Sequence, residues 1–154
     1  MIRPTEGSDC VAVMEILRAS GQFDADSLAF VQQTLDQHLK DPGPAIWLTA
    51  DDGEPVGVAY CAPEPVASDT WNLLMLFIRG DRRNRGLGNQ LVSHLESELR
   101  TRAARLLIVE TSGLPAFAVA RSFYPSAGFK YEATIKSFYA AGDDKLVFTK
   151  PLTT

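Results

Sequence analysis

An apolar run at residues 71–78 constrains the fold of this chain more than any other feature. A strand made almost wholly of apolar side chains is typical of the centre of a sheet, where both faces are covered. A turn rich in arginine and glycine follows the run, and leucines then recur every four residues from Leu87 to Leu99. That spacing predicts an amphipathic helix that begins at Asn84 or Gly86 and ends near residue 102.

The rest of the chain is interpreted in the same way. Apolar and alternating runs predict further strands at residues 2–4, 45–50, 56–61, 106–109, 130–139 and 145–150. Further helices are expected near residues 9–20, 27–39 and 115–126, the second of them capped by Asp26 or Ser27. Asp52-Gly53 between two apolar runs indicates a hairpin. The predicted fold is a mixed α/β sheet with the order β-α-α-β-β-β-α-β-α-β-β.

Length and composition exclude several classes of protein. A chain of 154 residues with 45% hydrophobic residues suits one compact domain over residues 1–154. The formal net charge of −4 argues against general nucleic-acid binding, and no apolar run is long enough to span a membrane. The beginning of the chain has no signal-peptide pattern, so we expect a cytoplasmic protein. Two cysteines, and two histidines without partners at ligand spacing, predict no disulfide framework and no metal site.

The turn after the apolar strand is the strongest functional signal. Backbone N–H groups at the start of a helix have no partner within the helix and favour an anion. Glycines at positions 86 and 88 allow a phosphate to approach the backbone closely. Four arginines lie within residues 79–85, at positions 79, 82, 83 and 85. These features together predict a phosphate-binding loop.

The type of phosphate ligand follows from what surrounds the glycines. A Walker loop needs Lys-Ser/Thr after its last glycine, and a dinucleotide fingerprint needs a third glycine or alanine; neither is present. The segment Arg83-Asn84-Arg85-Gly86-Leu87-Gly88 instead resembles the Q/R-x-x-G-x-G/A loop of the GNAT family of N-acetyltransferases. Tyr124-Pro125-Ser126-Ala127-Gly128-Phe129 resembles the Y-x-x-x-G-F segment of that family. Phe138-Tyr139-Ala140-Ala141-Gly142-Asp143-Asp144-Lys145 is similar to a bacterial branch of it.

This resemblance implies acetyl-CoA as co-substrate and gives several residues expected roles. The pyrophosphate would bind the backbone of Arg83, Asn84, Arg85, Gly86, Leu87, Gly88 and Asn89. The pantetheine arm would pair with the strand end at Leu76, Phe77 and Ile78. Many family members also hold pantetheine with an asparagine seven residues before the tyrosine; here Phe117 stands at that position, and the contact would become packing.

The resemblance also points to catalytic residues. Tyr124 corresponds to the family's general acid, which would assist the thiolate leaving group; the alternative is a core tyrosine packed beside Phe123 and Phe129. The family's usual acidic residue on the central strand is replaced by Leu73. Glu110 follows a buried strand and lies where α/β sites open, so it is the candidate base or ammonium-binding group. The alternative is a carboxylate at the rim of the site with no role.

The acceptor is expected to be a small-molecule amine or a protein amine. Trp71, Glu110, Phe138 and Tyr139 are the candidate walls of its pocket, and the simplest alternative for the three aromatic residues is strand packing. Attack of the amine on the thioester would be direct, because no activated cysteine or serine is evident. Dimerisation is common in the family, so a homodimer is an open expectation.

Two other functions remain compatible with the sequence. The missing acid at position 73 allows a catalytically weak module that senses CoA or binds a partner through the same loop. A different phosphate ligand, such as a nucleotide, would also suit a helix N-terminus next to arginines.

Overall fold

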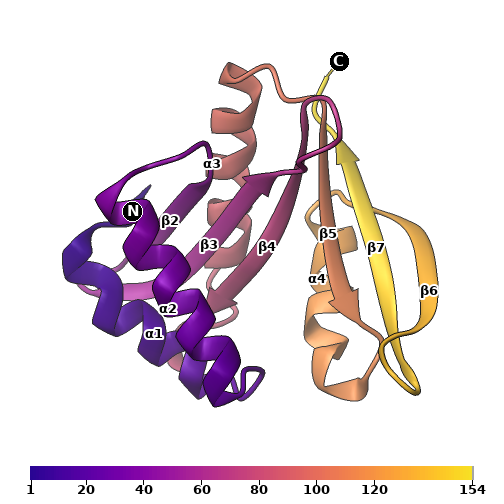
Figure 1. The fold of residues 1–154 in the computed structure, drawn as a ribbon, viewed down its shortest axis with the longest axis horizontal. Coiled ribbons are helices and arrows are strands. Elements are labelled where there is room, and N and C mark those ends of the chain that lie inside the picture. The colour runs from indigo at the N-terminus through magenta and orange to yellow at the C-terminus, as the bar shows by residue number, and fades with distance from the viewer. Residues whose placement is uncertain (154) are drawn as a thin grey trace. The chain divides into compact units, whose positions relative to one another are not determined.

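The computed structural model describes residues 1–153 and contains a seven-stranded sheet. Its strands follow the order β1-β2-β3-β4-β5-β7-β6 (Figure 1). Strands β4 (Thr70–Ile78) and β5 (Leu106–Ser112) run parallel, and the hairpins at the two ends of the sheet are antiparallel. The predicted mixed α/β fold and its order of elements are confirmed.

The chain divides into two compact units, which are described separately. Unit 1 comprises Met1–Ala62 and Met75–Leu95, and unit 2 comprises Pro63–Leu74 and Glu96–Thr154. Strand β4 contributes its last residues to unit 1 and its first residues to unit 2. In unit 2 it pairs with β5 from Thr70 opposite Leu106 to Leu73 opposite Val109.

Unit 1 has two helices packed on one face of an antiparallel hairpin (Figure 1). Apolar side chains of both helices meet Trp47, Val58 and Met75 of the strands in one buried cluster. The hairpin turns at Gly53, whose φ of 86° lies in the region that glycine adopts without cost, as the Asp-Gly pair predicts. The elements of unit 1 are β1 (Ile2–Pro4), a 3₁₀ turn (Gly7–Asp9), α1 (Cys10–Ala19), α2 (Ala25–Lys40), β2 (Ile46–Asp51), β3 (Pro55–Pro63, its last residue in unit 2), a second 3₁₀ turn (Gly80–Arg82) and most of α3 (Leu87–Thr101).

The first turn of α2 corrects one prediction. Neither Asp26 nor Ser27 is the N-cap; the cap is Asp24, whose carboxylate accepts a hydrogen bond of 2.7 Å from the backbone N–H of Ser27. The apolar stripe does not reveal where the helix begins, because the start is set by the capping side chain of Asp24, which lies outside the stripe.

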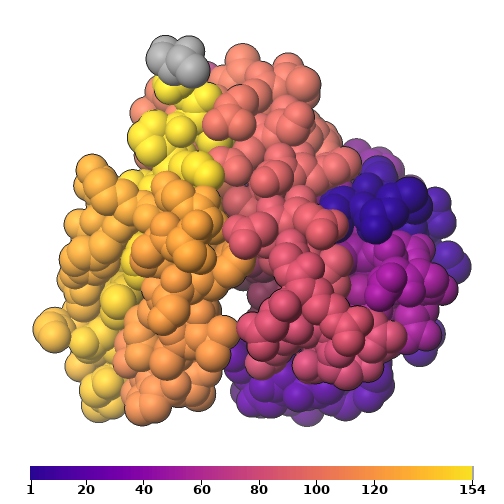
Figure 2. All heavy atoms as spheres, turned by 180° about the vertical axis from the view of Figure 1, so that it is seen from behind, coloured from indigo at the N-terminus to yellow at the C-terminus, as the bar shows by residue number. Residues whose placement is uncertain are grey.

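Unit 2 packs one helix on its strands. Tyr124 of α4 (Ala118–Ser126) is buried against Phe129 and Phe148, with ring centroids 5.6 and 6.0 Å away. Seen from behind, α4 covers the strands of this unit (Figure 2). A 3₁₀ turn (Pro115–Phe117) precedes the helix. The helix ends before Gly128, whose φ is 94°. The remaining strands are β6 (Lys130–Ala140) and β7 (Asp143–Pro151).

Three predicted burial patterns are wrong. Strand β4 is not covered throughout, since Leu74 is 48% exposed. Strand β6 does not alternate between buried and exposed residues, because it is the outer strand of the sheet and has only β7 beside it. The i,i+4 spacing of Glu96 and Arg100 in α3 predicts a pair on the solvent side, but Glu96 lies in the interior; it is 6% exposed, and its Oε1 lies 2.7 Å from Lys150 Nζ.

None of the helices within residues 1–153 combines the length and apolarity needed to cross a membrane.

Candidate functional site

The turn that opens α3 exposes its backbone. Arg83 is extended, Asn84 takes a left-handed φ of 62°, and Gly86 takes a φ of 80°. Gly86 accepts a hydrogen bond of 3.0 Å from Gln90 N, the first turn of the helix. A Cβ added at Gly86 would meet no atom within 4 Å, so the space above this glycine is open. The loop therefore presents N–H groups in a conformation that glycine permits.

The four arginines of the turn divide into two pairs, which corrects their interpretation as one basic cluster. Arg79 forms ion pairs with Asp81, at 2.7 Å, and with Glu54. Arg82 pairs with Asp81 at 2.8 Å and with Asp52 at 3.3 Å.

Within the described part of the chain, the other two arginines of the turn, Arg83 and Arg85, are not engaged in ion pairs of this kind. Both side chains are exposed and neither has a carboxylate partner among residues 1–153. A pyrophosphate needs backbone donors and mobile cations that are not already neutralised. The open glycine and these two arginines fit that requirement, so the loop suits a diphosphate group.

The end of β4 is shaped by a glycine that sequence reasoning missed. Leu76, Phe77 and Ile78 are half-buried. A Cβ on Gly57 of β3 would lie 2.8 Å from Ile78 Cδ1 and 3.3 Å from the carbonyl oxygen of Phe77. Gly57 thus lets the strand that leads to the loop lie close against β3. A glycine inside a strand pattern is the available signal for such an approach.

Tyr124 lies in an apolar environment in unit 2. The residue is 7% exposed, and Phe123, Phe129 and Phe148 surround its ring. Burial raises the pKa of the Tyr124 phenol above its ordinary value, because the interior disfavours the phenolate. The hydroxyl therefore stays protonated at neutral pH and is available as a hydrogen-bond donor.

Glu110 lies at the centre of a polar network on the opposite face of the unit 2 strands. Val109 and Phe148 are paired across β5 and β7 on the face that α4 covers, so Glu110 and its partner Val147 point the other way. Glu110 Oε2 lies 2.7 Å from Lys145 Nζ, and Asn72 Nδ2 donates to Glu110 Oε1 at 3.4 Å. The Glu110 side chain is 27% exposed, so it is shielded but still reachable from solvent.

The network includes three residues that the sequence interpretation did not propose. Asn72 Nδ2 also donates to Glu64 Oε1 at 2.9 Å, so one amide joins two carboxylates. Asn72 Oδ1 is buried and has no hydrogen-bond partner among residues 1–153. Lys145 closes the network from β7. A polar Asn72 inside an otherwise apolar strand is the one sequence signal that can reveal this cluster.

The predicted acceptor walls do not all meet. Phe138 lies near Glu110, because the Lys145 ammonium that pairs with Glu110 also sits 4.0 Å from the Phe138 ring centroid. Tyr139 contacts Phe138 edge-to-face at 5.1 Å, and burial together with Glu110 and Asp143 raises the pKa of its phenol. Trp71 is on the other face of β4, with the guanidinium of Arg102 5.5 Å above its ring. Phe117 is half-buried where α4 begins.

Other chemically active side chains lie apart from this network. Cys10 and Cys61 lie in unit 1, and burial raises the pKa of the Cys10 thiol, which disfavours the reactive thiolate. Within residues 1–153 no group of three or more potential ligand side chains is placed to hold a metal ion.

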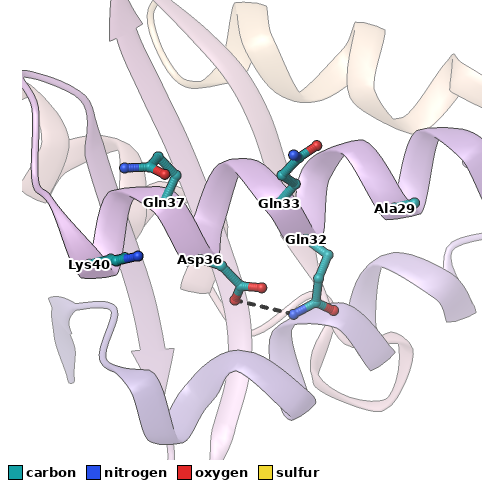
Figure 3. A pocket seen from close by; sticks show the side chains of 6 residues that line it. All are labelled: Ala29, Gln32, Gln33, Asp36, Gln37 and Lys40. Atoms are coloured by element: carbon teal, nitrogen blue, oxygen red, sulfur yellow. Dashed lines mark hydrogen bonds between the residues drawn. The ribbon is translucent and has the colours of Figure 1, made fainter.

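A shallow pocket lies along α2 alone, where Gln32 Nε2 donates to Asp36 Oδ1 at 3.4 Å (Figure 3). None of its lining residues is a predicted site residue.

Comparisons with known proteins show the family to which the chain is similar. Residues 11–129 match the acetyltransferase (GNAT) family. The chain is 37% identical over 109 residues to the [ribosomal protein bS18]-alanine N-acetyltransferase of Salmonella typhimurium, a match that covers 68% of this chain and 69% of that protein. The Phe138–Lys145 segment lies outside the family match, so the bacterial branch inferred from it remains a prediction.

Solved structures extend the likeness to the whole fold. A protein assigned to the GNAT family from Desulfovibrio desulfuricans has a TM-score of 0.93 and 29% identity, with 99% of each chain covered. An aminoglycoside 6'-N-acetyltransferase complexed with coenzyme A has a TM-score of 0.81 over 100% of this chain and 98% of that one. At 17% identity, the second likeness concerns the fold alone.

Proposed function

The chain belongs to the acetyltransferase (GNAT) family, and on that basis we propose that its acceptor is a cationic amine bound beside Glu110. The protein is an acetyl-CoA-dependent N-acetyltransferase. This activity takes precedence over the two other functions that the sequence left open, a module without turnover and a site for another nucleotide.

One observation carries the proposal for the acceptor. Asn72 joins the carboxylates of Glu64 and Glu110, and only one of the two has a lysine partner within residues 1–153. The cluster therefore keeps a negative charge that favours an ammonium group. The unpartnered Asn72 Oδ1 adds a buried acceptor for an N–H donor.

The residues of this chain suit the steps of acetyl transfer. Gly86, Arg83 and Arg85 would hold the diphosphate of acetyl-CoA, which supplies the activated acetyl group. Glu110 would accept the proton that an ammonium must lose before it can attack.

Tyr124 would act at the leaving group. Because burial raises the pKa of its phenol, full proton transfer to a thiolate with an ordinary pKa near ~8.5 is unfavourable. A hydrogen bond donated to the developing thiolate is the role that this environment supports.

The acceptor class is narrowed by the more similar relative. The Salmonella protein acts on an alanine of ribosomal protein bS18. An alanine residue in a protein carries a free amine only at the N-terminus, so we propose a protein N-terminal amine as the acceptor. The aminoglycoside enzyme resembles this chain in fold, which makes a small polycationic amine the second candidate.

The test is release of free thiol from acetyl-CoA with a panel of amines. The panel contains a peptide with a free N-terminal alanine, the same peptide with a blocked N-terminus, kanamycin and spermidine. We expect release with the free peptide and none with the blocked one. Release with kanamycin or spermidine alone would replace the first candidate by the second, and no release with any amine would contradict a cationic acceptor.

Variants of the network test the role of Glu110. Glu110→Gln keeps the shape of the side chain and removes its basic oxygen, so kcat should fall by roughly tenfold or more. Glu98→Gln is the matched control, since Glu98 pairs with Arg102 at 2.7 Å on the surface of α3. Equal rates for Glu110→Gln and the unchanged protein would exclude Glu110 as the base.

A homodimer and a cytoplasmic location remain predictions.

A further inference from the structure

One amine of the chain already lies where an acceptor amine must lie. A general base acts on a proton within hydrogen-bond reach, about 2.6–3.2 Å between heavy atoms. Lys145 Nζ is 2.7 Å from Glu110 Oε2, so it meets this requirement without any movement. An external amine that uses Oε2 of Glu110 as its base must occupy the same place.

The position of Lys145 is fixed from several sides. Its side chain is 13% exposed, and its ammonium lies between the Glu110 carboxylate and the face of the Phe138 ring at 4.0 Å. Asn72 holds the other oxygen of Glu110 at 3.4 Å. A nucleophile held in this way loses little freedom on the path to reaction, which accelerates transfer.

Lys136 on the same hairpin provides a contrast. Its ammonium pairs with Asp144 at 3.3 Å, and its side chain is 84% exposed. A reagent from solvent reaches Lys136 more easily than Lys145. Catalysed acetylation should favour Lys145, whereas uncatalysed acetylation should favour Lys136.

We propose that Lys145 is an internal acceptor, which the protein acetylates on Nζ when no external amine occupies its place beside Glu110. The inference rests on the proposed role of Glu110 as base.

The chemistry balances with acetyl-CoA as the only co-reactant. The Lys145 ammonium gives one proton to Glu110, and the freed lone pair on Nζ forms the bond to the acetyl carbonyl carbon. The C–S bond breaks, and its electron pair leaves with the sulfur. Nζ then loses a second proton, so one of the two protons converts the thiolate into free CoA and the other passes to solvent. The product amide is neutral, and the ion pair with Glu110 is lost.

The experiment compares two acetyl donors by peptide mass spectrometry on the full chain. With sulfo-N-hydroxysuccinimide acetate, which needs no catalysis, we expect Lys136 to react faster than Lys145. With acetyl-CoA and no amine we expect the reverse, with Lys145 faster by roughly tenfold or more. At saturating acetyl-CoA the half-time should not change with protein concentration, because each protein molecule acetylates its own Lys145.

The Glu110→Gln variant distinguishes acetylation of Lys145 that Glu110 catalyses from acetylation that depends only on the exposure of Lys145. This variant should lose the modification of Lys145 by acetyl-CoA, while Lys145 reacts with the succinimide ester at least as fast as before. Slower acetylation of Lys145 than of Lys136 by acetyl-CoA would overturn the proposal, as would equal modification of Lys145 in Glu110→Gln. Thiol release with the amine panel but an unmodified Lys145 would reject this inference alone and leave the proposed function intact.

Discussion

Arg3 Nη1 lies 2.7 Å from Asp9 Oδ2, and Nη2 of the same guanidinium lies 2.9 Å from Asp51 Oδ2. The Asp9 side chain is only 3% exposed, and its Oδ2 also accepts a hydrogen bond of 2.8 Å from Glu6 N. One arginine on the edge strand β1 thus neutralises a buried carboxylate at the start of α1 and joins it to the end of β2. This relationship fixes three elements of unit 1 to one another.

Replacing Arg3 by methionine should destabilise the protein by about 3 kcal/mol, because it leaves the buried charge of Asp9 without its cation. Chemical denaturation at neutral pH measures the change. Arg18→Met is the matched control: Arg18 pairs with Glu15 at 2.7 Å, but both side chains are more than half exposed. That variant should lose no more than about 0.5 kcal/mol. Similar losses of unfolding free energy in the two variants would show that the burial of Asp9 does not determine how much its ion pair with Arg3 contributes to stability.

The same pair predicts how stability depends on acidic pH. Hydrogen bonding to Arg3 lowers the pKa of Asp9 below its ordinary value near 3.8. A carboxyl group with a depressed pKa in the folded state contributes stability above its unfolded pKa, and that contribution is lost as the pH falls through the folded value. The difference in unfolding free energy between the unchanged protein and Asp9→Asn should therefore narrow below about pH 4. A constant difference down to pH 3 would contradict the assignment.

Local patterns predicted the parts of the fold that depend on neighbouring residues. The hairpin at Gly53 and the helix end before Gly128 follow from turn chemistry within a few positions. Burial of Glu96 did not follow from spacing, although Val92, one turn earlier, is buried beside the leucine stripe. A carboxylate at such a position is tolerated because Lys150, from the distant β7, reaches it.

The candidate site was predictable only where it is continuous in sequence. Residues 83–88 were identified from one segment, whereas the pairing of Glu110 with Lys145 depends on the register between β5 and β7. Phe138 reaches the same network from β6, whose register shifts twice along its length. Such shifts change which side chains share a face, and no local pattern specifies them. The ion pairs of Arg79 with Glu54 and of Arg82 with Asp52 do not follow from a local pattern either, because they join the loop to the distant turn between β2 and β3.

Removing Arg83 and Arg85 should weaken CoA binding, because their charges are not neutralised by carboxylates. The double variant Arg83→Ala/Arg85→Ala should raise the Kd for CoA by roughly tenfold at low salt, and less at high salt because exposed charges are screened. Isothermal titration calorimetry measures both. Arg82→Ala is the control, since Arg82 already pairs with Asp81 and Asp52. A larger effect from Arg82→Ala than from the double variant would refute this division of the arginines.

The backbone at Gly86 supports a separate prediction about the loop. A left-handed φ of 80° costs an ordinary residue about 1 kcal/mol or more, and no atom within 4 Å would oppose an added Cβ. Gly86→Ala should therefore weaken CoA binding by roughly fivefold or more through backbone strain alone. Gly80→Ala is the control, because it also meets no atom within 4 Å and its φ is not left-handed. Equal affinities for the two variants would show that the left-handed backbone is unimportant for the ligand.

Tyr124 should contribute to turnover through its hydroxyl group. Tyr124→Phe keeps the aromatic packing with Phe129 and Phe148 but removes the only donor of the side chain. We expect kcat to fall by roughly tenfold to a hundredfold, with the KM for acetyl-CoA changed by less than about threefold. Unchanged kcat/KM, under conditions where chemistry limits the rate, would exclude Tyr124 from the reaction and leave it as a core residue.

The burial of Tyr124 also predicts alkaline instability, which is independent of turnover. A phenol whose pKa is raised in the folded state contributes stability below its unfolded pKa near ~10, and this contribution is lost as the pH rises toward the folded value. Above about pH 10 the unchanged protein should lose up to about 1.4 kcal/mol more per pH unit than Tyr124→Phe. If the free energies of unfolding of the two proteins change equally between pH 9 and 11.5, the hydroxyl is not shielded from water. Because the slope reports the phenol itself, it tests the burial of the hydroxyl independently of its part in turnover.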